Sequence, residues 1–282
     1  MTIQSLSVVV PAKKCWNNCK FCVSRMRNDE HIYSADGVEI EDYLARMVFA
    51  RDNGCSSMVI TGTTEPQQNM EFIRKLSEVN RQLPHPFYHI DFQTTGSGMK
   101  YEDFARLREF GVTTISISLS APVDEKNWDI HGTPKALRVP MHCLFENVKQ
   151  NRLNLRLSIN MTNAWSEFES EDFFRFGTDA NADQITIRKL YSSGANLTQD
   201  KWIVENRYPK YMLEVLRSYI LENGTHIRNL PYGLRVYSVH GISVAIDDDC
   251  MSKDNPSDLK YVILRPNGKL YCRWDDKGSL IF

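Results

Sequence analysis

The 282-residue sequence has no apolar run that approaches the roughly 20 residues of a membrane-spanning helix. It also lacks an excess of charge of either sign, since 34 Lys and Arg stand against 35 Asp and Glu. A near-neutral chain carries no electrostatic signature for nucleic acid or for an acidic membrane surface. The first apolar stretch is short and ends in lysines, so it does not resemble a signal peptide. We therefore expect a cytoplasmic protein with neither a membrane nor a nucleic acid as its partner.

A disulfide framework is also absent. Seven cysteines are an odd number, and a chain of this length does not need stapling. In a reducing cytosol, cysteines serve as metal ligands, as catalytic thiols or as small buried residues. Three of the seven are clustered in the stretch KKCWNNCKFC. The other four stand alone, and core packing is the first interpretation of each: Cys55, Cys143, Cys250 and Cys272.

Internal repeats, low-complexity tracts and Gly/Ser linkers are missing, so the length fits one large globular unit. Short β-branched runs alternate with segments of helical periodicity along the first two thirds of the chain. Six such strand–helix units predict an α/β fold, a partial (β/α)6 TIM-like barrel with right-handed crossovers. The six predicted strands span residues 5–10, 57–61, 87–95, 113–120, 153–161 and 183–190.

The last part of the chain has a different pattern. Residues 201–224 have helical periodicity with a break near Pro209, and four short strand patterns separated by turn signals follow. We expect the architecture to change at about residue 200. Residues 1–200 would form the partial barrel, and residues 201–282 would add a C-terminal helix and a small antiparallel extension that caps it.

Polar loops follow four of the predicted strands. They are the cysteine loop and the segments GTTEP, TTGS and SLSAP. In α/β barrels, functional groups sit at the carboxyl ends of the strands, where such loops converge. The sequence therefore predicts one site at the mouth of the barrel.

The cysteine loop supplies three thiolates, Cys15, Cys19 and Cys22, at the spacing C-x3-C-x2-C. A structural zinc site uses four ligands, and His31 is the nearby candidate for the fourth. A [4Fe–4S] cluster is normally held by four thiolates, so three would leave one iron open to a small molecule. At this point both kinds of site remain open.

The spacing C-x3-C-x2-C, with the aromatic Phe21 directly before the last cysteine, resembles the signature of the radical S-adenosylmethionine (radical SAM) superfamily. The resemblance implies one [4Fe–4S] cluster on the three cysteines and SAM on the open iron, with Phe21 near the adenine. It implies an enzyme that cleaves SAM to a 5′-deoxyadenosyl radical, which abstracts a hydrogen atom from the substrate. An electron donor such as flavodoxin or ferredoxin is the implied partner.

The other loops resemble this superfamily more weakly. TGTTEP resembles the GGEP motif that holds the methionine amine, and TTG resembles the TNG that often ends strand three, with the Asn lost. For Glu65, an acid at a helix N-terminus is an equally good interpretation, because the helix dipole favours it there. The SAM-binding residues implied by these two loops are Gly62, Thr63, Thr64, Glu65 and Thr95.

Strands four and five supply the remaining implied contacts. SLSAP resembles the SLD end of strand four, with Ser118 in the serine place and Ser120 in place of the usual acid. In LRLSIN, Arg156 and Ser158 resemble the residues that contact the carboxylate and ribose of SAM. An arginine suits a carboxylate because its planar fork binds both oxygens. A strand-end hydroxyl without a ligand is the alternative for Ser118.

The C-terminal cysteines contain no C-x2-C element, which argues against a second cluster. Cys272 is instead a candidate hydrogen-atom donor to a substrate radical, with buried packing as the alternative. The layout resembles the partial-barrel branch that contains the molybdenum-cofactor GTP cyclase and viperin-like enzymes. Four scattered arginines could contact phosphate, although such arginines are usually solvated: Arg188, Arg235, Arg265 and Arg273.

Three functions remain open at this stage. The first is hydrogen abstraction from a small polar substrate, with a nucleotide as the first choice. The second is radical SAM modification, such as epimerisation, of a peptide, a protein or a nucleic-acid base. The third belongs to another class, a non-catalytic iron–sulfur or zinc sensor.

Overall fold

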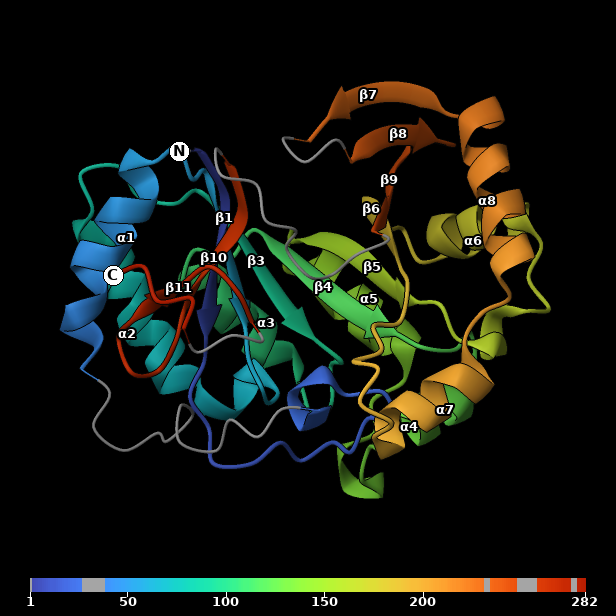
Figure 1. The fold of residues 1–282 in the computed structure, drawn as a ribbon, viewed down its shortest axis with the longest axis horizontal. Coiled ribbons are helices and arrows are strands. Elements are labelled where there is room, and N and C mark those ends of the chain that lie inside the picture. Colours follow the sequence, from blue (N-terminus) through green and yellow to red (C-terminus); the bar gives the residue numbers. More distant parts are fainter. Residues whose placement is uncertain (1, 27–38, 231–233, 248–257, 275–277) are drawn as a thin grey trace.

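The structure is a computed structural model, and it describes residues 2–26, 39–230, 234–247, 258–274 and 278–282. Six parallel strands form the centre of its sheet, and each pairs with the next along the chain (Figure 1). They are β1 (Thr2–Val9), β2 (Ser57–Thr61), β3 (His89–Thr94), β4 (Thr114–Leu119), β5 (Asn154–Asn160) and β6 (Gln184–Arg188).

The C-terminal strands extend this sheet at both edges. They are β7 (Thr225–Asn229), β8 (Arg235–Val239), β9 (Ile242–Asp247), β10 (Asp258–Leu264) and β11 (Leu270–Tyr271). The strand order is β11-β10-β1-β2-β3-β4-β5-β6-β9-β8-β7. The pairs β7–β8, β8–β9 and β10–β11 are antiparallel, whereas β9 joins β6 and β10 joins β1 in parallel. The prediction of an α/β fold with an open, mostly parallel sheet is confirmed. The C-terminal strands are antiparallel among themselves as predicted, but they join both edges of the central sheet through parallel pairs instead of forming one antiparallel extension.

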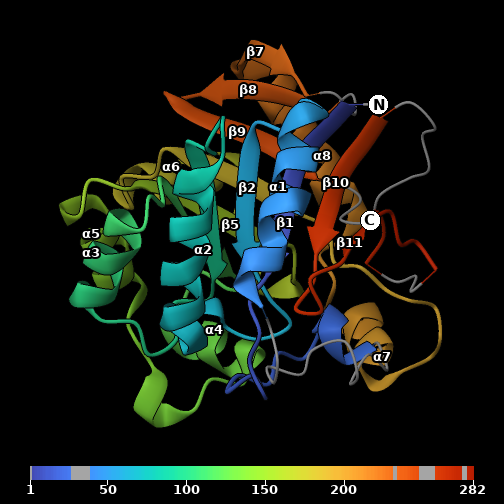
Figure 2. The ribbon, with the colours of Figure 1, turned by 90° about the vertical axis from the view of Figure 1, so that its left-hand side faces the viewer.

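Helices α1, α2, α3 and α5 cover one face of the sheet, as Figure 2 shows. Each connection between two consecutive strands from β1 to β6 contains at least one helix, because a parallel connection must cross back over the sheet before the next strand begins. The helices are α1 (Tyr43–Asp52), α2 (Met70–Gln82), α3 (Tyr101–Glu109), α4 (Asp124–His131), α5 (Met141–Gln150), α6 (Ser170–Asp179), α7 (Thr198–Asn206) and α8 (Lys210–Asn223). Short 3-10 turns are η1 (Val23–Met26), η2 (Ile40–Asp42), η3 (Pro66–Asn69), η4 (Lys135–Leu137) and η5 (Asn163–Trp165).

Two elements differ from the sequence-based prediction. α4 lies where a loop was expected, because its eight residues, DEKNWDIH, have no clear apolar periodicity. β7 was not predicted either, since all five of its residues are exposed and give no alternating pattern. The predicted break near Pro209 is confirmed: α7 ends at Asn206, and α8 begins directly after Pro209.

Strand register divides the sheet into a polar and an apolar face. Partners in register point to the same side of the sheet, and successive residues alternate. The row Gln93, Ser116, Arg156 and Gln184 therefore lies on one face, which we call the inner face. The neighbouring row Phe92, Ile115 and Leu155 is fully buried on the outer face, in the main hydrophobic core beneath the helices.

This division determines where chemistry is possible. The outer face stabilises the fold by burying apolar side chains against the helices, at about 25 cal/mol per Å² of apolar surface. The inner face carries polar side chains, which do not contribute to an apolar core and are therefore candidates for binding or catalysis. At the chain's end, Phe282 stacks on Phe49 of α1 with ring centroids 5.6 Å apart. None of the described helices is both long and apolar enough to cross a bilayer.

Candidate active site

The cysteine loop begins directly after β1 and lies at the carboxyl ends of the strands. In Figures 1 and 2 it runs beside α4 and α7. Two backbone hydrogen bonds fix it to α4: Asn18 N–H donates to His131 O at 3.0 Å, and Lys20 N–H donates to Ile130 O at 3.0 Å. The last carbonyls of a helix have no partner within the helix, so α4 offers the loop ready acceptors.

Gly132 makes this close approach possible. It ends α4 in the left-handed conformation, with φ of 58°. A Cβ at this position would lie 2.6 Å from Asn18 O, a distance that real Cβ atoms essentially never show. Glycine is therefore required twice over, by its backbone angle and by the packing of the cysteine loop.

The buried side chain of Asn17 joins the cysteine loop to the loops after β2 and β3. Its amide nitrogen, which carries two N–H groups, lies within hydrogen-bonding distance of Glu65 Oε1 (3.2 Å), Thr95 Oγ1 (2.9 Å) and Ser97 Oγ (3.0 Å). Its amide oxygen accepts from Ser97 Oγ at 3.1 Å. Asn17, which sequence analysis did not single out, thus connects three of the four predicted mouth loops.

Glu65 is the acceptor at the centre of the same network. Its Oε2 accepts from Thr94 Oγ1 at 2.6 Å, from the Thr95 N–H at 3.0 Å and from Gln67 Nε2 at 3.0 Å. The side chain is buried and makes no capping bond to the following 3-10 turn. Glu65 therefore joins two loops. It does not cap the turn that follows it, and its carboxylate is not free of partners.

The 3-10 turn η3 holds the other half of the cysteine loop. Gln68 Nε2 donates to Lys14 O at 2.8 Å, and Asn69 Nδ2 donates to Pro11 O at 2.9 Å. Side-chain amides that reach a neighbouring backbone replace the hydrogen bonds that an irregular loop cannot make to itself. The loop is consequently fixed at both ends before any ligand binds.

The three thiols influence one another. Burial, then the Glu65 charge, raise the pKa of Cys15 to about 11. Burial, followed by the nearby Cys22 and Glu65, raises the pKa of Cys19 well above its usual range. Thiols that stay protonated in the metal-free chain bind a metal ion only with release of their protons. The donor set is all sulfur, which suits iron–sulfur chemistry.

The described residues offer no group of three His, Cys, Asp or Glu that could hold a single metal ion. Each cysteine of a cubane cluster ligates a different iron, so these sulfurs stand farther apart than the ligands of one ion. His31, the candidate fourth zinc ligand, lies outside the described residues.

The loop after β2 shows a second sign of a ligand site. Thr64 Oγ1 is buried and has no hydrogen-bond partner within the described structure. Buried polar atoms are nearly always paired, so an orphan atom needs an explanation. A Cβ on Gly62 would lie 2.9 Å from Thr64 O, so this loop is held in a tight turn. Thr63 is half-buried beside them.

Phe21 packs between two helices. Its ring centroid lies 6.0 Å from that of His131 on α4 and 6.0 Å from that of Trp202 on α7. The structure thus gives Phe21 a packing role, and its predicted place beside the adenine stays a prediction.

On the inner face, Arg156 is already paired with a carboxylate. Its Nη1 lies 2.5 Å from Asp91 Oδ2, and its Nε donates to Gln184 Oε1 at 2.7 Å. Ser116 Oγ also donates to Asp91, at 2.6 Å. Asp91 was not predicted, although its alternation with Gln93 along β3 marks it as a polar inner-face residue.

Ser118 and Ser158 lie in register on the same face, one row nearer the mouth. Ser158 is buried and Ser118 is half-buried. Neither side chain hydrogen-bonds to another described residue, so both hydroxyls are available to a ligand. Cys272 follows β11 and is half-buried, and its N–H donates to Ser279 O at 3.0 Å.

A buried polar group beside the cysteine loop was missed by sequence reasoning. His131 Nε2 lies 2.9 Å from Ser120 Oγ, which also accepts from Asn160 Nδ2 at 3.2 Å. Burial lowers the pKa of His131 to about 4, so the ring is neutral near pH 7. Only the unpredicted helix α4 brings His131 to this position.

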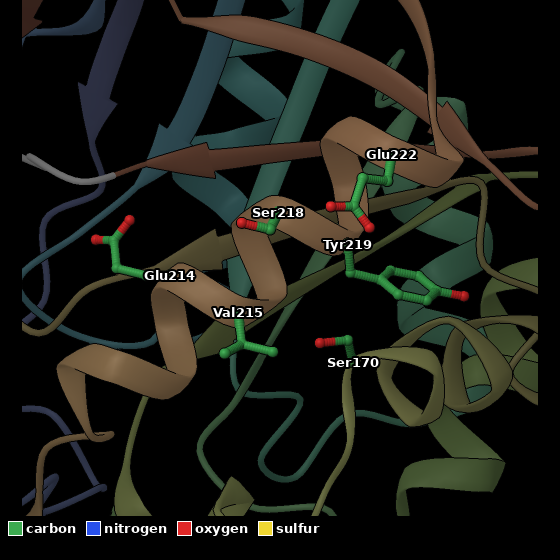
Figure 3. Close-up of a pocket in the computed structure, with 6 residues that line it drawn as sticks. All are labelled: Ser170, Glu214, Val215, Ser218, Tyr219 and Glu222. Carbon is green, nitrogen blue, oxygen red and sulfur yellow. The ribbon is translucent and has the colours of Figure 1, made fainter.

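A surface hollow between α6 and α8 is separate from these residues (Figure 3). None of the predicted site residues lines it. Its lining consists of Ser170, Glu214, Val215, Ser218, Tyr219 and Glu222. The predicted cysteine, carboxylate and hydroxyl groups lie at the mouth and not in this hollow.

Residues 9–148 match the family model of the radical SAM superfamily. The chain belongs to the radical SAM superfamily. This superfamily uses a [4Fe–4S] cluster and SAM, so both predicted cofactors are confirmed. Membership supports SAM-cleaving radical chemistry and hence an enzyme, without specifying the reaction. A search of curated protein sequences finds no significant match.

Solved radical SAM structures share the fold. SuiB of Streptococcus suis bound to the precursor peptide SuiA has a TM-score of 0.61 and 14% identity, covering 95% of this chain and 59% of that one. Coproporphyrinogen III oxidase (HemN) of Escherichia coli has a TM-score of 0.55 and 13% identity, covering 79% and 54%. The protein anSMEcpe with bound AdoMet has a TM-score of 0.55 and 16% identity, covering 67% and 52%.

These likenesses establish the partial barrel and nothing finer, because the identities are low. The radical SAM chain described here spans between 52% and 59% of the length of these three proteins. The division at residue 200 stays a prediction.

Proposed function

We propose that this radical SAM protein is an enzyme that abstracts a hydrogen atom from a small polar substrate bound at the mouth of the inner face. The observation that carries the proposal is the Asn17–Glu65 connection. It brings the three-cysteine loop and the loop containing the orphan Thr64 hydroxyl together, at the carboxyl ends of the strands. A cluster on the cysteine loop and SAM on the loop that contains Thr64 would then lie next to each other.

In this proposal Cys15, Cys19 and Cys22 ligate the cluster. When bound, the cluster and SAM would supply the radical chemistry by which a hydrogen atom is removed from the substrate. The chain's own residues bind and orient SAM. They are Phe21, Gly62, Thr63, Thr64, Glu65, Thr95, Ser118, Arg156 and Ser158.

The contacts within the protein refine these roles. Glu65 has both carboxylate oxygens engaged, so it acts by positioning the loop rather than by donating its charge to SAM. Arg156 is oriented by Asp91 and Gln184, whose bonds occupy its Nε and Nη1. Among these side chains, the Thr64 hydroxyl is buried and has no hydrogen-bond partner within the described structure.

Anaerobic reconstitution with iron and sulfide tests the proposal. With a reductant and SAM, the wild-type protein should form a brown cluster and release 5′-deoxyadenosine. Cys19→Ala should abolish both, whereas Cys55→Ala should retain both, because Cys55 is a buried thiol that donates to Ser57 O. A protein that binds zinc, forms no cluster and releases no 5′-deoxyadenosine would instead be a sensor of the third class.

A second candidate substrate is a peptide. It is favoured by the structural likeness to SuiB, which was solved with its precursor peptide, and to anSMEcpe, which was solved with the Cp18Cys peptide. Deuterium transfer into 5′-deoxyadenosine from labelled candidates distinguishes the two classes. A labelled nucleoside triphosphate that transfers deuterium supports the first, and a labelled peptide encoded by a neighbouring gene supports the second.

Two further roles belong to the same proposal. Cys272 would return a hydrogen atom to a substrate radical, and Cys272→Ala should then allow SAM cleavage but change the product. A flavodoxin or ferredoxin would supply the electron.

A further inference from the structure

Arg265 directly follows β10 on the inner face of the sheet. Ile263, two residues earlier, is in register with Ser7 of β1, and Val9 at the end of β1 packs in one cluster with Ile263 and Tyr271. Because β10 runs parallel to β1, Arg265 lies at the carboxyl ends of the strands. It is therefore at the edge of the mouth, beside the strand from which the cysteine loop starts.

The structure buries this arginine and fixes its orientation. Arg265 is only 1% exposed. Its Nη2 donates to Trp274 O at 2.9 Å and to Arg273 O at 3.2 Å, and its Cζ lies 4.5 Å from the ring centroid of Tyr271. Its own carbonyl accepts from Tyr43 Oη at 3.0 Å. The side chain is consequently not a solvated arginine, contrary to the general expectation for scattered arginines.

More than half of its hydrogen-bonding capacity is nevertheless unused. Nε and Nη1 are buried and have no hydrogen-bond partner among the described residues, and no described carboxylate forms an ion pair with them. A buried charge is costly unless it is paired and hydrogen-bonded. A cation–π contact with Tyr271 offsets part of this cost, but it uses none of the N–H donors.

We propose that Arg265 binds an oxyanion, a phosphate or a carboxylate, carried by the substrate of this enzyme. Guanidinium groups bind both anions through charge-assisted hydrogen bonds, and the low dielectric around a buried arginine strengthens them. The carbonyls of Arg273 and Trp274 hold the group so that the anion does not have to order it. The inference rests on the proposed function only in assigning the anion to the substrate.

The test is ligand-dependent thermal unfolding of the reconstituted full chain. Inorganic phosphate and succinate are titrated separately, at an ionic strength held constant with sodium chloride. A ligand that binds the folded chain raises Tm in a saturable way, from which an apparent Kd follows. Arg265→Gln should weaken binding of the effective anion about tenfold or more, the usual consequence of losing charged hydrogen bonds.

Two variants make the comparison specific. Arg235→Gln makes the same change at an exposed arginine of β8 and should leave the phosphate and succinate responses unchanged. Arg265→Lys keeps the charge but loses the planar fork, so it should bind the anion more weakly than the wild type. It also provides a folded comparison if the Gln variant does not fold.

The outcomes separate the sources of the anion. A response to phosphate alone indicates a phosphate-bearing substrate, and a response to succinate alone indicates a carboxylate. Equal responses of the wild type and the Arg265 variants would overturn the proposal. So would phosphate binding that appears only in the Asp275→Asn, Asp276→Asn double variant, because the chain itself would then supply the anion. Asp275 and Asp276 lie outside the described residues.

The proposed function can fail independently. A protein that binds the oxyanion through Arg265 but releases no 5′-deoxyadenosine contradicts the enzymatic function alone. A protein that cleaves SAM but shows no Arg265-dependent response contradicts this inference alone.

Discussion

The amide of Asn17 donates a hydrogen bond to the carboxylate of Glu65 across 3.2 Å, between two motifs that lie 48 residues apart in the chain. One motif carries the cysteines and the other carries the GTTEP loop. A buried amide with this many partners cannot be removed without leaving several of them unpaired. The pair therefore determines how the cysteine loop is placed relative to the GTTEP loop.

Asn17→Ala should lower the free energy of unfolding by about 1–3 kcal/mol, because it leaves buried partners such as Ser97 without their amide. It should also reduce the iron retained after reconstitution. Urea unfolding and iron analysis measure the two effects. Asn18→Ala is the matched control, since Asn18 is the exposed neighbour in the same loop. Equal losses in both variants would show that the Asn17 network is not what holds the loop.

Gly132→Ala should displace the cysteine loop from α4. The new methyl group would overlap Asn18 O, in addition to the cost of about 1 kcal/mol for alanine at positive φ. Gly241→Ala has the same backbone cost at φ of 82° but has no atom within 4 Å of the added methyl. The difference between the two variants in unfolding free energy and in cluster content isolates the overlap. A difference near zero would contradict the close packing.

Asp91→Asn should destabilise the chain by about 2–3 kcal/mol, because Arg156 would then remain on the inner face without its ion-pair partner. The estimate is below the cost for a fully buried pair, since the Arg156 side chain is 25% exposed. Adding Arg156→Gln should restore part of the loss. A double-mutant cycle by urea unfolding gives the coupling, and strict additivity would show that the pair is not coupled.

The free energy of unfolding should decrease as the pH is lowered through a window set by the pKa of His131. Its pKa is about 4 in the folded chain and 6.5 when unperturbed, because burial disfavours the charged ring. As pH falls from 6.5 towards 4, the unfolded chain takes up a proton that the folded chain does not. The contribution, up to about 3 kcal/mol, is therefore present above pH 6.5 and lost towards pH 4.

The comparison of wild type with His131→Gln removes the background of the carboxylates, which titrate in both proteins. Urea unfolding at pH 7.5, 6 and 5 should show the wild type losing more stability than the variant. Parallel pH profiles would mean that His131 is not buried in its neutral form.

Local sequence patterns were sufficient for much of the fold. The alternation of β-branched runs and helical periodicity, with polar loops after the strands, predicted the α/β class and the mostly parallel sheet. The cysteine spacing predicted the superfamily and its cofactors, because three thiolates on one loop are a local property of the chain. The break at Pro209 was equally local, since proline lacks the N–H that a continuous helix needs.

Only the tertiary structure placed Asn17 against Glu65, Asp91 against Arg156, and His131 beneath the cysteine loop. Each of these relationships joins polar residues that are distant in sequence, and polar side chains leave no periodic signal of which partner they will meet. The burial of Arg265 has the same origin. A lone arginine in a sequence is usually solvated, and only the pairing of β10 with β1 and the return of the chain through β11 enclose it.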